Sequence, residues 1–348
     1  MAIYHTFITL LVPAVAAYVI TLISTKFLSG YLFESGVFEE DQNKGRLVRL
    51  PSSLGLAVVF GTVVGILTYA FGVSFLVNSQ RAVLDVRDLF AVSMSLLLIS
   101  LVGFLDDINV KKRRVNATEI KSFKKGLKQW QKPLLTILGA LPLMAINAGV
   151  NVVRVPFIGN ISLGLWYPLL VLPLAIIFAS NAVNLLGGFD GLQPGMGAIA
   201  LAGLFVYSVI YGTHMGALIS AVMLASVLAF LPFNLGKVIP GDSFTYALGT
   251  GLIAVMVLGN AEAFGIIIFI PWIIEFLLHL RKGFKVSDLG IKQKDGTFKA
   301  PYGKHIYSLT HLIMNIKKVR ERDVSAYLSL IEFAFVVLAF LMKLGGFL

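Results

Sequence analysis

The sequence contains no cysteine in 348 residues, and only 5 histidines. The missing cysteine excludes disulfide bonds and thiolate metal centres, and no histidine pair has the spacing of a zinc site. Charged residues are scarce, at 14% of the chain against 57% hydrophobic residues, and the mean hydropathy is +0.86. This composition excludes a soluble globule and predicts a polytopic helical membrane protein.

Ten apolar stretches have about the 20 residues that a helix needs to cross a bilayer. They cover residues 3–28, 52–77, 88–105, 133–150, 162–182, 194–212, 215–233, 243–260, 262–280 and 325–347. We find no internal repeat, and the first stretch is too long and lacks the basic start of a signal peptide. The fold predicted is all-α: one integral-membrane domain over residues 1–348, a bundle of about ten transmembrane helices with a long cytoplasmic loop at 281–324.

Lysine and arginine decide the orientation, because they gather on the cytoplasmic side of membrane proteins. With the N-terminus outside, 25 of the 29 Lys and Arg residues fall on the inner side. This predicts that both termini lie outside. The formal charge of +11 then reflects cytoplasmic loops and anionic ligands rather than nucleic acid.

Four polar clusters fall on the predicted inner face, at the ends of different spans. The clusters comprise Asp106 and Asp107; Asn181, Asn184 and Asp190; Asn234, Lys237 and Asp242; and His279, Arg281 and Lys282. The alternative is that such acids only end a helix at the water interface. Charges at bilayer depth are costly, and four clusters sorted to one face favour a functional site there.

Three further loops belong to the same face. Asn43 and Lys44 precede a glycine-containing helix start, which suits a ligand contact, although ordinary positive-inside charge explains them equally well. Residues 116–130 have apolar residues at helical spacing between lysines, which predicts an amphipathic interfacial helix. The Asp295-Gly296 pair predicts a hairpin in the long loop, a flap that with Arg281, Lys282 and His305 could cover a phosphate.

Hard oxygen ligands without cysteine favour Mg²⁺, or alternatively Mn²⁺. Asp242, after Gly241 at a helix start, suits a metal ligand, and Asn184 offers a second oxygen. Gly188 allows a close backbone approach, and the following helix start favours anions. The residues predict a site for a metal-bound polyphosphate at the membrane surface.

The segments FLDDIN, NAVNLLGGFDGL and GDSFTYALG, in this order, resemble the polyprenyl-phosphate N-acetylhexosamine-1-phosphate transferases. PYGKHIYSLTHLIM is more similar to the archaeal and eukaryotic dolichyl-phosphate branch, and the histidine run of the bacterial branch is missing. The resemblance implies transfer of GlcNAc-1-phosphate from UDP-GlcNAc to a polyprenyl (dolichyl-type) phosphate, with Mg²⁺ and release of UMP.

The same resemblance implies roles for individual residues. Asp242 and Asn184 would hold the metal on the pyrophosphate, and Asp190, where the dolichyl branch often has Asn, would lie near the uridine. Asp106 and Asp107 would lie at the reacting phosphates, either as a base or as organisers of metal and lipid phosphate. HLRKGFK is the nearest counterpart of a segment that grips the sugar phosphate.

Other functions remain open from the sequence. The same reaction with another UDP-N-acetylhexosamine is one alternative, and an ion-coupled secondary transporter is a second, because buried acids also mark such sites. A receptor-like protein would not need three glycine-flanked acidic motifs, and a CDP-alcohol phosphotransferase would need aspartates four residues apart. The sequence leaves the oligomeric state open, a homodimer included.

Overall fold

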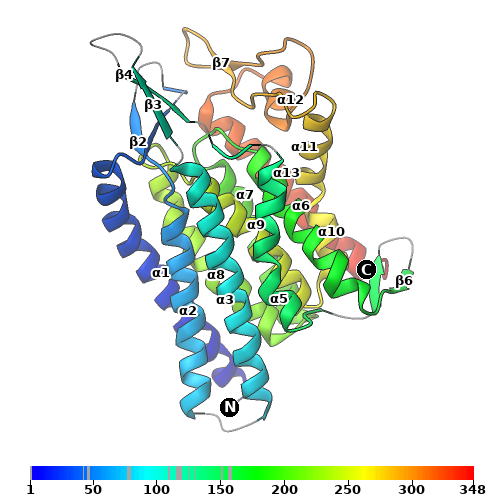
Figure 1. Ribbon diagram of the computed structural model, residues 1–348. Coiled ribbons are helices and arrows are strands. Elements are labelled where there is room, and N and C mark those ends of the chain that lie inside the picture. The colour runs from blue at the N-terminus through cyan, green and yellow to red at the C-terminus, as the bar shows by residue number, and fades with distance from the viewer. Residues whose placement is uncertain are drawn as a thin grey trace.

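The helices form one bundle in the computed structural model (Figure 1). The structure describes residues 2–41, 43–44, 48–76, 80–108, 110–114, 120–124, 126–128, 130–149, 152–155 and 159–348. Within these residues, seven helical segments are long and apolar enough to span a membrane. They are α1 (Ala2–Glu34), α2 (Gly55–Leu76), α3 (Gln80–Asp107), α6 (Leu172–Leu185) with the π-helical turn Tyr167–Val171 before it, α7 (Leu192–Ile210), α8 (His214–Asn234) and α13 (Glu321–Leu344).

Two more predicted spans have a different form. α10 (Glu262–Ile268) and α11 (Ile270–Leu280) meet at 54° and count as an eighth, broken span. Pro271 lies in the first turn of α11, where its missing N–H and its ring stop one straight helix from continuing. α9 (Asp242–Leu258) is apolar but only 17 residues long. The all-helical membrane fold is confirmed, with seven or eight spans in the described part of the chain.

The predicted span 133–150 is not one continuous helix over its described residues, 133–149. α4 (Gln131–Thr136), a 3₁₀ turn (Ile137–Gly139) and α5 (Leu141–Ala145) follow one another, and a turn with Asn147 at φ 54° ends the segment. Pro142 at the start of α5 has no N–H for the preceding turn, which explains a break there.

Small antiparallel hairpins form in connections between the helices. β1 (Phe38–Glu40) pairs with β2 (Arg49–Pro51), β3 (Val110–Arg114) with β4 (Ile120–Lys124), β5 (Val152–Val155) with β6 (Gly159–Ser162), and β7 (Ile291–Lys292) with β8 (Phe298–Lys299). The predicted hairpin around Asp295 is confirmed. The amphipathic helix predicted for 116–130 is wrong at 120–124, where β4 pairs with β3, and Asn116 and Glu119 lie outside the described residues.

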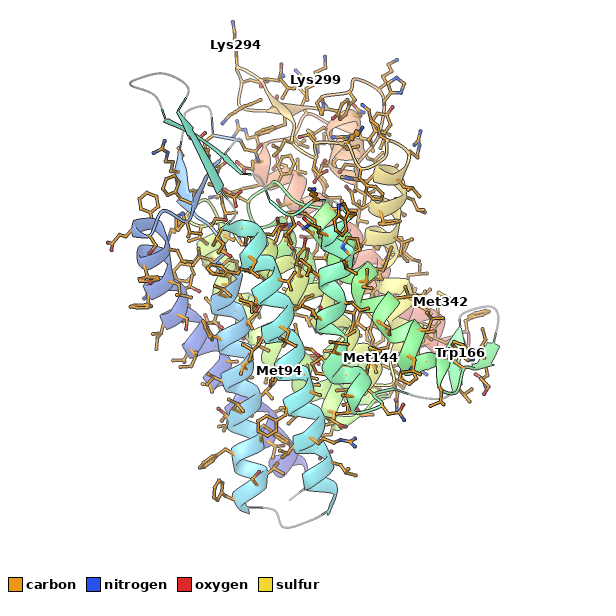
Figure 2. All side chains as sticks on the ribbon, viewed as in Figure 1. Met94, Met144, Trp166, Lys294, Lys299 and Met342 are labelled. Atoms are coloured by element: carbon orange, nitrogen blue, oxygen red, sulfur yellow. The ribbon has the colours of Figure 1, made fainter. Side chains whose placement is uncertain are left out.

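The two ends of the bundle differ in character. β2, β3, β4, β7 and α12 (Leu309–Ile316) gather at one end, and the N-terminus lies at the other (Figure 1). Lys294 and Lys299 lie at the hairpin end, whereas Met94 and Met144 lie along the bundle and Trp166 beside β6 (Figure 2). Large apolar side chains such as Phe71 and Phe75 are exposed along the helices, as expected of surfaces that face lipid.

α9 is the central helix. It packs against α2, α3, α6, α7 and α8, and it is buried along most of its length. Glycines allow its N-terminus to lie against the neighbouring helices: a Cβ at Gly103 of α3 would lie 2.5 Å from the carbonyl carbon of Asp242. The start of α2 is tied to the loop before α9, since Gly55 N donates to Pro240 O at 2.9 Å.

We expect Gly103→Ala to destabilise the protein by about 1–3 kcal/mol, the usual range for overpacking, because backbone atoms cannot move aside as a flexible side chain can. Gly72→Ala on α2 is the matched control, since a Cβ there meets nothing within 4 Å. Thermal unfolding in detergent should show a lower midpoint for Gly103→Ala alone. Equal midpoints would contradict the close approach of α3 and α9.

Candidate active site

The N-terminus of α9 is held by Asp107, the last residue of α3. The Asp107 carboxylate accepts hydrogen bonds from the backbone N–H of Asp242 at 3.0 Å, from that of Ser243 at 3.4 Å, and from the Ser53 hydroxyl at 2.6 Å. A carboxylate at a helix N-terminus satisfies free N–H groups and is favoured by the helix dipole. Gly241, with φ 75°, makes the turn that lets the chain pass this carboxylate.

Asp106, the neighbouring acid, belongs to a different group of charges. The Lys132 ammonium of α4 lies 2.6 Å from Asp106 Oδ2 and 3.1 Å from Asp242 Oδ2. The other oxygen of Asp106 accepts a hydrogen bond from Leu127 N. Burial alone would lower the pKa of Lys132, but the carboxylates of Asp242 and Asp106 outweigh burial and raise it, so the bridging lysine is charged.

A cavity of about 390 Å³ opens beside Asp242. Asn184 at the end of α6, Gly188 and Asp190 before α7, and Asp242 all line it. Seven carboxylates are among the described lining residues, and none of these residues is Lys or Arg: Glu39, Glu40, Asp41, Asp190, Asp242, Asp288 and Glu321. Such a lining repels an anionic ligand unless cations come with it.

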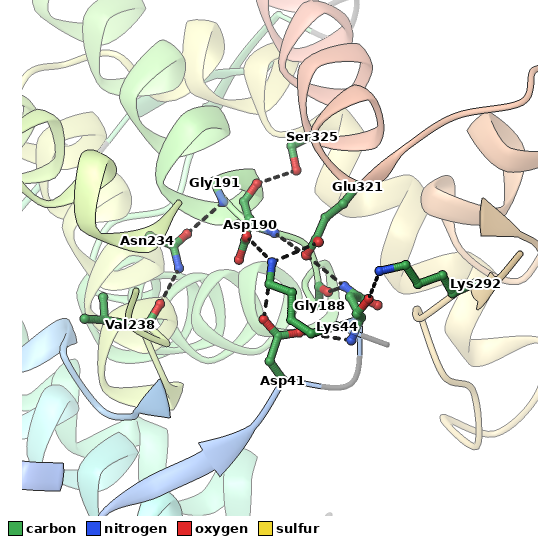
Figure 3. A network of polar contacts seen from close by, with 11 residues as sticks. Asp41, Lys44, Gly188, Asp190, Gly191, Asn234, Val238, Lys292, Glu321 and Ser325 are labelled. Atoms are coloured by element: carbon green, nitrogen blue, oxygen red, sulfur yellow. Dashed lines mark hydrogen bonds and ion pairs between the residues drawn. The ribbon is translucent and has the colours of Figure 1, made fainter. Parts of the chain in front are cut away.

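A lysine-centred network closes one side of this cavity (Figure 3). Lys44 Nζ lies 2.8 Å from Asp190 Oδ2, 3.1 Å from Glu321 Oε2 and 3.5 Å from Asp41 Oδ2. Asn43 donates to Gly188 O and, at 3.2 Å, to Glu321 Oε1. The network therefore joins the segment before α2, the turn before α7 and the start of α13.

This network also sets the charge states of its members. Burial alone would lower the pKa of Lys44, but the hydrogen bond with Asp190 and the nearby Glu321 outweigh burial and raise it. Burial raises the pKa of Asp190, and the Glu321 carboxylate adds to the effect while Lys44 opposes it. The ammonium of Lys44 is thus the cation that keeps several carboxylates together.

Residues 286–289 of the loop after α11 line the cavity, but Arg281, Lys282 and His305 point elsewhere. The exposed Lys282 ammonium lies over the rings of Tyr302 (3.9 Å) and Tyr307 (4.7 Å), and Arg281 lies over Tyr307 at 5.9 Å. His305 is exposed and stacks on Tyr307. None of these three basic residues lines the cavity.

Two other predicted site residues also lie apart from the cavity lining. Lys237 is exposed. Asn181 lies one helical turn before Asn184 and donates to Thr136 Oγ1 at 3.2 Å and to Ile177 O at 2.7 Å. Asn181 therefore ties α6 to α4. The structure brings together Asn43, Lys44, Asp106, Asp107, Asn184, Gly188, Asp190 and Asp242.

Two residues of the site were not singled out from the sequence. Lys132 is one of nine basic residues between 106 and 132, and nothing local separates it from the others except that Pro133 follows. Glu321 opens the last span, 277 residues after its partner Lys44. The sequence offered one signal for Glu321, an acid at the start of an apolar span. Asp323 shares this signal, so it does not single out Glu321.

Comparison with known proteins identifies the family. A profile of glycosyl transferase family 4 matches residues 89–260, which include Asp106, Asp107, Asn184, Asp190 and Asp242. A protein of Sulfolobus acidocaldarius, named as a candidate UDP-N-acetylglucosamine–dolichyl-phosphate N-acetylglucosaminephosphotransferase, is 30% identical over 335 residues, 95% of each chain. A protein of Saccharolobus solfataricus with the same name is 29% identical over 340 residues, 97% of each chain.

A bacterial relative matches a shorter part. The phospho-N-acetylmuramoyl-pentapeptide-transferase of Lactiplantibacillus plantarum is 34% identical over 185 residues, 52% of this chain and 55% of the relative.

Fold, site and relatives together define an integral-membrane phospho-sugar transferase. The chain belongs to glycosyl transferase family 4, among the polyprenyl-phosphate N-acetylhexosamine-1-phosphate transferases. The transporter and receptor alternatives are thereby set aside.

Replacing Lys44 with Met should leave Asp41, Asp190 and Glu321 without their shared cation. We expect the free energy of unfolding to fall by about 2 kcal/mol. This is below the usual cost of breaking a fully buried ion pair, because the Lys44 side chain is 28% exposed. The three acids present oxygens within 4.8 Å of one another, so Mg²⁺ or Ca²⁺ should restore part of the stability. Thermal unfolding with and without the cation checks both effects.

Lys294→Met in the exposed hairpin is the control, and it should leave the midpoint unchanged. A Lys44→Met protein as stable as the wild type, and indifferent to the cations, would contradict the role given to Lys44.

Proposed function

We propose that this protein transfers GlcNAc-1-phosphate from UDP-GlcNAc to a polyprenyl phosphate of the dolichyl type, and releases UMP. An acceptor phosphate oxygen attacks the phosphorus that bears the sugar, and the bond from that phosphorus to the bridging oxygen of UMP breaks. The names of the two archaeal relatives, each aligned over at least 95% of this chain, support this donor and acceptor. The product is a lipid-linked sugar diphosphate, the first intermediate in building a lipid-linked glycan.

The acidic cavity is the observation that carries the proposal. A pyrophosphate cannot approach seven carboxylates without a divalent cation, and the cavity offers hard oxygen donors of the kind that Mg²⁺ prefers. Asp242 and Asn184 fit the cation best, since they lie on facing helices, α9 and α6, at the cavity end of each. Mn²⁺ suits the same donors. When bound, the cation neutralises charge on the pyrophosphate.

The remaining residues of the site supply positive charge or position the donor. Lys132 lies between Asp106 and Asp242, and so offers the positive charge nearest to the proposed metal ligand. Asp190 and Gly188 form the cavity wall next to Lys44 and Asn43, where we place the nucleoside end of the donor. Lys237, Arg281, Lys282 and His305, which do not line the cavity, fit contacts with the membrane surface or the lipid phosphate better than contacts with the nucleotide.

Asp107 acts in this proposal as a positioning residue. Its carboxylate already accepts bonds from two backbone N–H groups and a hydroxyl, and it lies behind Asp242 rather than in the cavity wall. A lipid phosphate has its second pKa near 6, so at pH 7 the acceptor is largely a dianion and needs no general base. Asp106 similarly serves to fix Lys132.

The site lies on the cytoplasmic side in this proposal, with both termini outside. The charge distribution supports this orientation, because the end that carries the cavity also carries most Lys and Arg residues. A water-soluble UDP-sugar would reach the cavity directly from the cytoplasm.

The first test uses purified protein in detergent with labelled UDP-GlcNAc, a polyprenyl phosphate and Mg²⁺. Label should pass to the organic phase, require the cation, and fall at least about 10³-fold in Asp242→Ala, because an electrostatic group at the reacting phosphate is lost. Gly72→Ala serves as the active control. Label from another UDP-N-acetylhexosamine alone would correct the donor, and no transfer from any nucleotide sugar would overturn the proposal.

A second test separates positioning from base catalysis at Asp107. Asp107→Asn replaces one accepting oxygen with an NH₂ group that faces backbone N–H donors, so the start of α9 should shift and transfer should fall at least about 10²-fold at every pH. A rate recovered by raising the pH would instead support a base. Ser53→Ala, which removes one of the three donors and leaves both backbone bonds, should lose less activity than Asp107→Asn.

A further inference from the structure

A second cluster of ligating atoms lies outside the group around Asp242. Glu275 and His279 are one turn apart on α11, and Asp288 lies in the loop that follows. His279 Nε2 lies 2.9 Å from Glu275 Oε1 and 2.9 Å from Asp288 Oδ1. Glu275 is fully buried and His279 is 3% exposed.

The three converging atoms do not satisfy one another by hydrogen bonding. None of the three has a partner in hydrogen-bond geometry, although all are buried. An imidazole nitrogen carries either one proton or one lone pair, so it cannot donate linearly to two oxygens on different sides. Two carboxylate oxygens and a ring nitrogen that meet at one point form a ligand set for a cation.

The distances match such a set. Zn²⁺ with bonds of about 2.0 Å and tetrahedral angles holds its ligand atoms about 3.3 Å apart, close to the 2.9 Å found here. The mix of imidazole and carboxylates fits Zn²⁺ and related transition ions better than Mg²⁺, which takes oxygen ligands. Three protein ligands leave a fourth position for water.

The supporting contacts have the form expected around a metal. The second oxygen of Glu275 accepts a hydrogen bond from Leu309 N at 2.7 Å, at the start of α12. Thr310 Oγ1 donates to the backbone oxygen of Asp288 at 2.8 Å, which ties the start of α12 to this part of the loop. Such outer contacts hold ligating carboxylates in a fixed orientation.

We propose that Glu275, His279 and Asp288 bind a zinc-type divalent cation, separate from the cation on the donor pyrophosphate. The ion joins the end of α11 to the loop after it, and through Leu309 to α12. Because Asp288 and Gly187 both line the active-site cavity, the ion also fixes that part of the wall. The competing state is an imidazolium paired with two carboxylates, without metal.

Co²⁺ is a suitable probe, because its visible absorption reports ligation directly. Full-length protein without an affinity tag is stripped with chelator, kept in excess Mg²⁺ to occupy the Asp242 site, and titrated with Co²⁺. We expect an absorption band that saturates at about one equivalent per chain and is displaced by Zn²⁺. The band should persist in Asp242→Ala and fall below about 0.1 equivalent in His279→Gln.

Each outcome decides the proposal. No band in the wild type would overturn it and leave the imidazolium pair, and a band kept in His279→Gln or lost in Asp242→Ala would move the ion to another site. Asp288→Asn, at the cavity wall, is the second variant in case His279→Gln fails to fold, and it should also lose the band. Zn²⁺ should raise the midpoint of thermal unfolding of the stripped wild type but not that of Asp288→Asn.

Discussion

The capping of α9 by Asp107 is the interaction on which the site depends. A helix that begins inside the protein leaves backbone N–H groups that must find partners. Asp107 provides two of those partners, and the burial of its charge is offset because the donors are aligned N–H groups. Asp242, as the first residue of α9, takes its place from this cap.

The second constraint is the excess of acid around the cavity. Lys132 and Lys44 each bridge carboxylates that would otherwise repel one another, at opposite ends of the same site. Of the seven acids of the lining, Asp41, Asp190, Asp242 and Glu321 each lie against one of these lysines. The lining still carries more acids than bases, and its negative potential concentrates divalent cations.

The features predicted correctly from the sequence are those that a short stretch of residues determines by itself. Apolar length gives the spans, and the acids at Asp106, Asp107, Asp190 and Asp242 stand out because charge is rare in this chain. The prediction failed where the structure of a segment depends on its partner. The helical pattern of 116–130 cannot reveal that 120–124 pairs as a strand with 110–114. The roles of Lys132 and Glu321 likewise depend on packing between helices, and not on any motif.

The ion pair between Lys44 and Glu321 joins the first loop of the chain to its last helix. Helices enter a membrane in order during synthesis, so every residue matched by the family profile is made before Glu321. Until the ribosome has completed α13, the turn at Asp190 lacks both the Glu321 carboxylate and the hydrogen bond from Ser325. A nascent chain that still lacks α13 therefore lacks these two contacts, and the insertion of α13 supplies them.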